Sequence, residues 1–126
     1  MAEISNYDID IRNKFLDEAK SVDFLNSVFC IYFYNSDTKR WGPPPKPEDI
    51  SPVEVFGSYD QKEFDQAIDR CKKLINDGRK LGDLALDRAL EDSEYQKAQE
   101  AYHQNNLGFC KQNLSIAFSS GMRDMR

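Results

Sequence analysis

The residues best suited to nucleophilic catalysis are few: one histidine, His103, and three cysteines, Cys30, Cys71 and Cys110. A nucleophile and its general base must approach within roughly 3 Å for a proton to pass between them. On one unbroken helix, His103 and Cys110 would lie about 10 Å apart along the axis, because each residue advances the helix by about 1.5 Å. The sequence therefore predicts no pair between His103 and Cys110, while the spacing leaves open a pairing of His103 with Cys30 or Cys71 through space. A lone histidine is more often a surface or capping residue, and we expect a protein that is not an enzyme.

The sequence contains no recognisable motif for binding a metal ion or a phosphate group. The cysteines include no C-x-x-C pair, so they resemble neither a zinc site nor a disulfide framework. Asp8 and Asp10 form a D-x-D pair but lack the glycine and the twelfth-position acid of a calcium loop. The six glycines never fall into a phosphate-binding spacing. We expect no metal and no cofactor, and we interpret the cysteines as buried apolar residues of a protein in a reducing compartment.

Other residues are of types that bind proteins. Arg40 and Trp41 precede a proline run, and arginine and tryptophan are enriched at interfaces. For Trp41 the alternative is that it packs over the core. Together with aromatic and acidic residues, they make up the candidate partner-binding set: Arg40, Trp41, Tyr32, Tyr34, Asp65 and Asp69.

Charge and hydropathy restrict the partners. Seventeen basic and 22 acidic residues give a net charge of −5, which repels nucleic-acid phosphates and favours a basic protein surface. No run of eighteen apolar residues occurs, and the first thirty residues carry acids where a signal peptide has a basic start and an apolar middle. We therefore expect a soluble, cytoplasmic protein that binds neither membranes nor nucleic acid.

All five prolines lie between Pro43 and Pro52. One interpretation is a stiff connector, because proline fixes φ and cannot extend a sheet. The other is a docking ligand, since residues 44–47 satisfy P-x-x-P, although no basic residue lies at the flanking offset that such ligands commonly use. We favour a connector that spans residues 35–51 and forms a long proline-rich loop between two strands.

Two segments have the composition of strands. Residues 28–35 are β-branched and aromatic without glycine or proline, and residues 53–58 alternate in a way that suits a short strand. In a strand, Tyr32, Tyr34 and Cys30 would share one face. These patterns predict a small antiparallel sheet.

The clearest helix lies between Asp60 and Gly78. Asp60 is its expected N-cap, Tyr59 and Phe64 its hydrophobic staple, and residues 76–78 its end. Apolar residues recur within it at spacings of three and four. Further helices are expected at 10–22, from Arg79 to about 104, and, after a break at 105–106, over the last segment, where residues 114–118 also suit a strand.

These observations predict a single α+β domain over 1–126, with several helices packed on the sheet. No motif identifies a family. We expect a non-enzymatic, acidic protein-binding module of the kind that inhibitors and toxin-neutralising (immunity-like) proteins represent. The alternatives are a small-molecule or nucleotide-binding domain or enzyme, with a site assembled around Arg40, Trp41, Tyr34 and Asp60, and a homo-oligomeric structural subunit.

Overall fold

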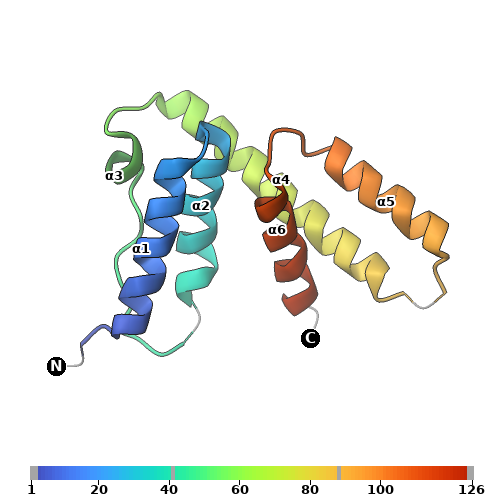
Figure 1. Cartoon of the computed structure of the whole chain (residues 1–126), viewed down its shortest axis with the longest axis horizontal. Helices are drawn as coiled ribbons and strands as arrows, with labels where there is room; N and C mark the ends of the chain where they lie inside the picture. The colour runs from blue at the N-terminus through green and yellow to red at the C-terminus, as the bar shows by residue number, and fades with distance from the viewer. Residues whose placement is uncertain (1–2, 41, 88, 125–126) are drawn as a thin grey trace. The chain divides into compact units, whose positions relative to one another are not determined.

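The computed structural model describes residues 3–40, 42–87 and 89–124, with the backbone alone for Arg40 and for 121–124. Every regular element in these ranges is a helix, and they contain no strand (Figure 1). Contacts divide the chain into two compact units, Met1–Ile68 (unit 1) and Asp69–Arg126 (unit 2), and the division falls inside one long helix. The single domain over 1–126 stays a prediction.

Unit 1 begins with two helices, α1 (Asn6–Ser21) and α2 (Phe24–Ser36), which pack against each other. The hydroxyl of Ser5 accepts a hydrogen bond from the Asp8 N–H (3.1 Å) and so caps α1. The helix predicted at 10–22 is confirmed, although it starts earlier. A short 3-10 helix, η1 (Thr38–Arg40), follows α2.

The strand predicted at 28–35 is wrong, because this segment is the body of α2. Most of the helix is buried around its circumference, namely Asn26, Ser27, Val28, Phe29, Cys30, Ile31, Phe33 and Tyr34. A helix buried on nearly all sides has a continuous apolar sequence, as a buried strand does, so the pattern alone does not distinguish them. Tertiary packing overrode the β propensity of these residues. Length did not distinguish them either, since the uninterrupted apolar run, residues 28–34, covers seven residues, which is within the usual range of a strand.

The second strand, predicted at 53–58, is also wrong, and the sheet with it. The segment contains α3 (Pro52–Phe56), a helix that begins with a capping box. The Ser51 hydroxyl accepts from the Val53 N–H (3.2 Å), and the Glu54 carboxylate accepts from the Ser51 N–H (2.8 Å). Proline at the first helical position adds to this start signal. The fold is therefore helical and not α+β, because local capping and burial outweigh strand propensity in both segments.

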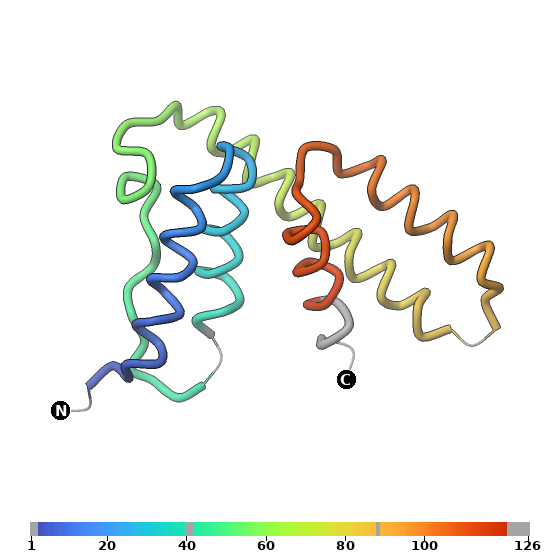
Figure 2. Tube along the Cα trace, viewed as in Figure 1, coloured from blue at the N-terminus to red at the C-terminus, as the bar shows by residue number. Residues whose placement is uncertain are grey.

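The proline-rich segment connects helices, not strands. From residue 42 to 51 the chain runs in an extended path back along α1 (Figure 2). Pro47 is buried, and the Lys46 ammonium pairs with the Asp8 carboxylate of α1 (3.3 Å). The P-x-x-P motif is thus partly enclosed by the fold, which supports the connector interpretation over a docking ligand.

The long helix α4 (Gln61–Ala85) starts as predicted but ends later. The Asp60 carboxylate accepts from the Glu63 N–H (3.1 Å), and the rings of Tyr59 and Phe64 are 5.4 Å apart. The cap and the staple are confirmed. The predicted end at 76–78 is wrong: the helix continues through Gly78, which lies against the backbone of another helix and does not terminate its own.

Unit 2 contains α4 from Asp69 onward, α5 (Asp92–Gln104) and α6 (Lys111–Asp124). The helix predicted from Arg79 to about 104 is only partly right, because residues 79–85 continue α4 and the described residues between Ala85 and Asp92 are not helical. The break at 105–106 is confirmed, and residues 114–118 are helical. The Tyr102 hydroxyl of α5 donates to the Leu114 carbonyl of α6 (2.6 Å). The buried side chains of this unit include Cys71, Leu74, Tyr102 and Ala117. None of the described helices combines the length and the apolar character that crossing a membrane requires.

Candidate functional site

The two candidate tyrosines lie in different environments. Tyr34 is only 1% exposed and belongs to the core, and this burial raises the pKa of its hydroxyl. Tyr32 is half-buried at the surface. A helix turns about 100° per residue, so residues two apart do not share a face. The expectation of a shared face is wrong, and Tyr34 is not positioned to touch a partner.

The other candidates are scattered. Arg40 ends η1, and Trp41 lies outside the described residues, so the proposed Arg40–Trp41 contact patch stays a prediction. Asp65 and Asp69 are both exposed on α4, as expected for a solvated face. Asp65 accepts from the Gln61 side-chain amide (2.9 Å). Of the four candidates whose side chains the structure describes, Tyr34 is buried, and Tyr32, Asp65 and Asp69 are at least partly exposed.

A hollow in the surface of unit 1 lies beside Tyr32. It has a volume of about 500 Å³ and is open to solvent. Its floor is apolar, and its residues come from α2, from the end of the proline-rich segment and from α4: Ile31, Ile50, Phe64 and Ile68. Tyr32 contributes from α2, whereas Asn35, Ser36, Asp49 and Ser51 supply polar groups. We call this feature the unit 1 hollow.

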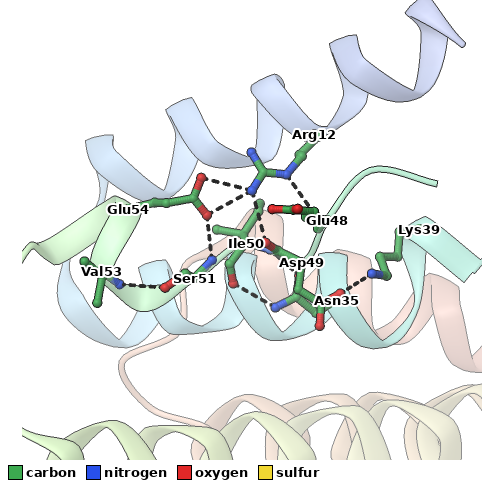
Figure 3. Close-up of polar contacts among 9 residues, drawn as sticks. All are labelled: Arg12, Asn35, Lys39, Glu48, Asp49, Ile50, Ser51, Val53 and Glu54. Atoms are coloured by element: carbon green, nitrogen blue, oxygen red, sulfur yellow. Dashed lines mark hydrogen bonds and ion pairs between the residues drawn. The ribbon is translucent and has the colours of Figure 1, made fainter. Parts of the chain in front are cut away.

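Asn35 fixes one wall of the unit 1 hollow. Its side-chain oxygen accepts from the Ile50 N–H (2.7 Å), and its amide nitrogen donates to the Ile50 carbonyl (2.9 Å) (Figure 3). Ile50 is 1% exposed, so these backbone groups need partners within the protein. The Asn35 amide therefore does for Ile50 what a neighbouring peptide group would do in a sheet.

Arg12 of α1 holds the same segment from the other side (Figure 3). Its guanidinium donates to the carbonyls of Glu48 (2.9 Å) and Asp49 (3.0 Å) and to both carboxylate oxygens of Glu54 (2.9 and 3.0 Å). The Glu54 carboxylate in turn accepts from the Ser51 N–H. Residues 48–54 are thus fixed by one arginine, which a lysine could not replace because the planar guanidinium makes several bonds at once.

The Glu54 carboxylate makes the stability of this arrangement depend on pH. The hydrogen bond from the Ser51 backbone, followed by the one from Arg12, lowers the pKa of Glu54 from its ordinary value of 4.5. A lowered pKa in the folded state contributes stability above the unfolded-state pKa, and that contribution disappears as the pH falls through the folded-state pKa.

We therefore expect Glu54→Gln to be less stable than the wild type at neutral pH, with the difference shrinking as the pH is lowered below about 4.5. The effect will stay under about 1 kcal/mol, since the Glu54 side chain is 37% exposed and solvent screens the pair. Thermal unfolding of both proteins from pH 7 to pH 3 measures it. A difference that stays constant over this range would contradict the assignment.

Acidic charge is unevenly divided between the two units. Unit 1 has 7 basic and 13 acidic residues, a net charge of −6, whereas unit 2 has 10 basic and 9 acidic residues, a net charge of +1. Three of the bases in unit 1 already pair with its own acids: Arg12 with Glu54, Lys39 with Asp49 and Lys46 with Asp8. The exterior of unit 1 is therefore strongly acidic.

Of the residues first considered for catalysis, Cys30 and Cys71 are buried, as predicted, whereas Cys110 is only partly buried. His103 is exposed on α5, where its ring meets the edge of Tyr102, with the ring centroids 5.8 Å apart. Burial raises the pKa of Tyr102, whose proton is donated to a carbonyl. In the part of the chain that is described, no three His, Cys, Asp or Glu side chains gather in a way that could hold a metal ion.

Sequence reasoning missed Arg12, Asn35, Ser51 and Glu54. Ser51 and Glu54 had a local signal, the S-P-V-E sequence, which is a capping box with proline at the first helical position. Arg12 and Asn35 had none, because Arg12 reaches partners 36–42 residues away and Asn35 a partner 15 residues away. Such pairs form only when the helices have packed.

The described residues define a helical protein of two compact units, whose clearest surface feature is a hollow in an acidic unit. Comparison of the chain with protein-family models, with curated proteins and with solved structures gives no match.

Proposed function

We propose that this protein is a non-enzymatic module that binds a basic surface of another protein through unit 1. The observation that carries the proposal is the division of charge, −6 in Met1–Ile68 and +1 in Asp69–Arg126. Complementary charge accelerates association and rejects partners of the wrong sign. A net charge concentrated in one half of a small chain therefore supports a directional interaction with a basic partner.

The exposed acids lie on several elements of unit 1. They include residues of α1, of the connector and of the start of α4: Asp10, Asp17, Glu48, Asp60, Glu63 and Asp65. Covering a partner's basic surface in this way would suit an inhibitor or a toxin-neutralising protein, and that is the role we propose. The burial of Cys30 and Cys71 supports a location in a reducing compartment such as the cytoplasm.

Affinity capture with matched variants tests the proposal. The tagged full chain is incubated with lysate of its source organism and washed at about 0.1 M and then about 1 M salt, where the screening lengths are about 10 and 3 Å. We expect one basic protein in stoichiometric amount, released at high salt. The double variant Asp10→Asn, Asp17→Asn should reduce its recovery several-fold.

The control is the double variant Asp83→Asn, Glu94→Gln, which removes the same charge from exposed positions of unit 2 and should leave recovery unchanged. Equal losses from both pairs would show that the overall charge matters and unit 1 does not. Recovery of only the chain itself would favour the homo-oligomeric alternative. A retained small molecule without a protein would favour a ligand-binding domain.

A further inference from the structure

The unit 1 hollow has the floor of an apolar side-chain pocket. Ile31 and Ile50 are 2% and 1% exposed and close its base, while Phe64 and Ile68 are half-buried along α4. Tyr32 adds a half-buried aromatic side chain from α2. Because Ile31 and Ile50 are already almost fully buried, the apolar surface that a ligand removes from water comes from Tyr32, Phe64 and Ile68, at about 25 cal/mol for each Å².

The rim of the unit 1 hollow includes one carboxylate, that of Asp49. The Asp49 side chain is 61% exposed although it pairs with Lys39, and a carboxylate has room for about four hydrogen bonds. A cation that approaches beside the apolar floor therefore meets the Asp49 carboxylate within a unit of net charge −6.

The wall is formed before any ligand arrives. Asn35 holds Ile50 by both backbone groups, and Arg12 holds the carbonyls of Glu48 and Asp49. A site whose backbone is already ordered loses little conformational entropy on binding.

We infer that the unit 1 hollow is a docking site for a segment of another protein in which one large apolar or aromatic side chain is flanked by lysine or arginine. This inference rests on the proposed function and specifies its partner. The apolar floor receives the central side chain, and Asp49 pairs with a flanking cation, while the net charge of unit 1 attracts the others. A small free ligand is usually enclosed over most of its surface, whereas this hollow is open. A side chain that is part of a larger interface obtains the remaining cover from its neighbours.

A titration followed by NMR tests this on the ¹⁵N-labelled full chain. The probes are the capped peptide Gly-Lys-Lys-Phe-Lys-Lys-Gly, the same peptide with serine in place of phenylalanine, and the same peptide with glutamate in place of every lysine. We expect the phenylalanine peptide to shift the amide signals of Tyr32, Ser36 and Ser51 in a saturable way, with a Kd of about 1 mM. The serine peptide should bind at least fivefold more weakly, and the glutamate peptide should not bind.

Matched variants locate the contact. Asp49→Asn and Asp17→Asn make the same change of charge at exposed positions of unit 1, one at the rim and one on α1. Likewise, Ile68→Ser shortens a side chain of the floor, and Ile9→Ser shortens one that is 40% exposed on α1. Asp49→Asn and Ile68→Ser should each raise the Kd of the phenylalanine peptide at least threefold. Asp17→Asn and Ile9→Ser should leave its Kd unchanged, because a peptide this short reaches only the hollow. The spectra also show whether each variant is folded.

Several results would overturn the inference: equal binding of the phenylalanine and serine peptides, shifts confined to residues 10–18 of α1, or no shifts at millimolar peptide. Free indole that shifts the same signals with equal affinity would assign the hollow to a small molecule. A basic partner captured equally well by Asp49→Asn and Ile68→Ser would leave the proposed function standing and refute this site. Peptide binding without any captured basic protein would refute the proposed function instead.

Discussion

Gly78→Ala will destabilise this protein, although alanine is the better helix former. A Cβ atom at position 78 would lie 2.7 Å from the carbonyl oxygen of Ala117 and 2.8 Å from its carbonyl carbon. Those atoms belong to the backbone of α6 and cannot rotate away as a flexible side chain could. Replacing glycine inside a helix gains about 1 kcal/mol where space is free. Here the forced separation of two helix backbones outweighs that gain, and we expect a net loss of about 1–3 kcal/mol.

The matched control for this prediction is Asn76→Ala, an exposed position on the same helix, which should leave stability unchanged or raise it slightly. Urea unfolding of the three proteins gives the free energies, and amide hydrogen exchange in α6 shows where protection is lost. Stabilisation by Gly78→Ala would mean that α4 and α6 do not touch at this glycine, and would contradict the packing of unit 2.

Asn35→Ala will destabilise unit 1 by about 2–4 kcal/mol. It removes both partners of Ile50, leaving a backbone N–H and a carbonyl of a buried residue without hydrogen bonds, and each such group costs about 1–3 kcal/mol. The same change should weaken peptide binding at the unit 1 hollow, because the wall formed by residues 48–51 is no longer held. Thermal and urea unfolding measure the loss, and Asn13→Ala, at an exposed position of α1, is the control.

The variant Asn35→Asp tests the two hydrogen bonds individually. A charged aspartate accepts from the Ile50 N–H as asparagine does, but its second oxygen faces the Ile50 carbonyl. A protonated aspartic acid can donate there, so folding raises the pKa of this carboxyl above its unfolded value. The stability of the variant relative to the wild type should therefore improve as the pH falls, and diminish as the pH rises through the raised pKa. Equal stabilities of wild type, Asn35→Ala and Asn35→Asp would show that this pair of bonds does not hold the wall.

These two positions differ in what the sequence could reveal. Gly78 follows Asn76 and Asp77, and this composition normally marks the end of a helix. Only the approach of the Ala117 backbone explains why the helix continues through it. Asn35 lies at the end of an aromatic run, and no local feature of the sequence predicts its hydrogen bonds to Ile50, 15 residues away.

The sequence by itself determined the features that depend on neighbours in the chain. The cap at Asp60, the Tyr59–Phe64 contact and the break at 105–106 were predictable because capping and stapling are local interactions. The S-P-V-E start of α3 was equally local. It was missed because the alternation of apolar and polar residues in 53–58 was interpreted as a strand. The acidic excess of the first 68 residues is also in the sequence, but only the contacts of the fold show that these residues form one unit.

Tertiary structure decided whether the apolar run of residues 28–35 is strand or helix, since both conformations would bury those side chains and only the surrounding helices select one. It also decided the candidate site. The hollow exists because Arg12 and Asn35 reach across the chain to hold residues 48–54, and hydrogen bonds between distant segments leave no pattern in the sequence until packing brings the segments together.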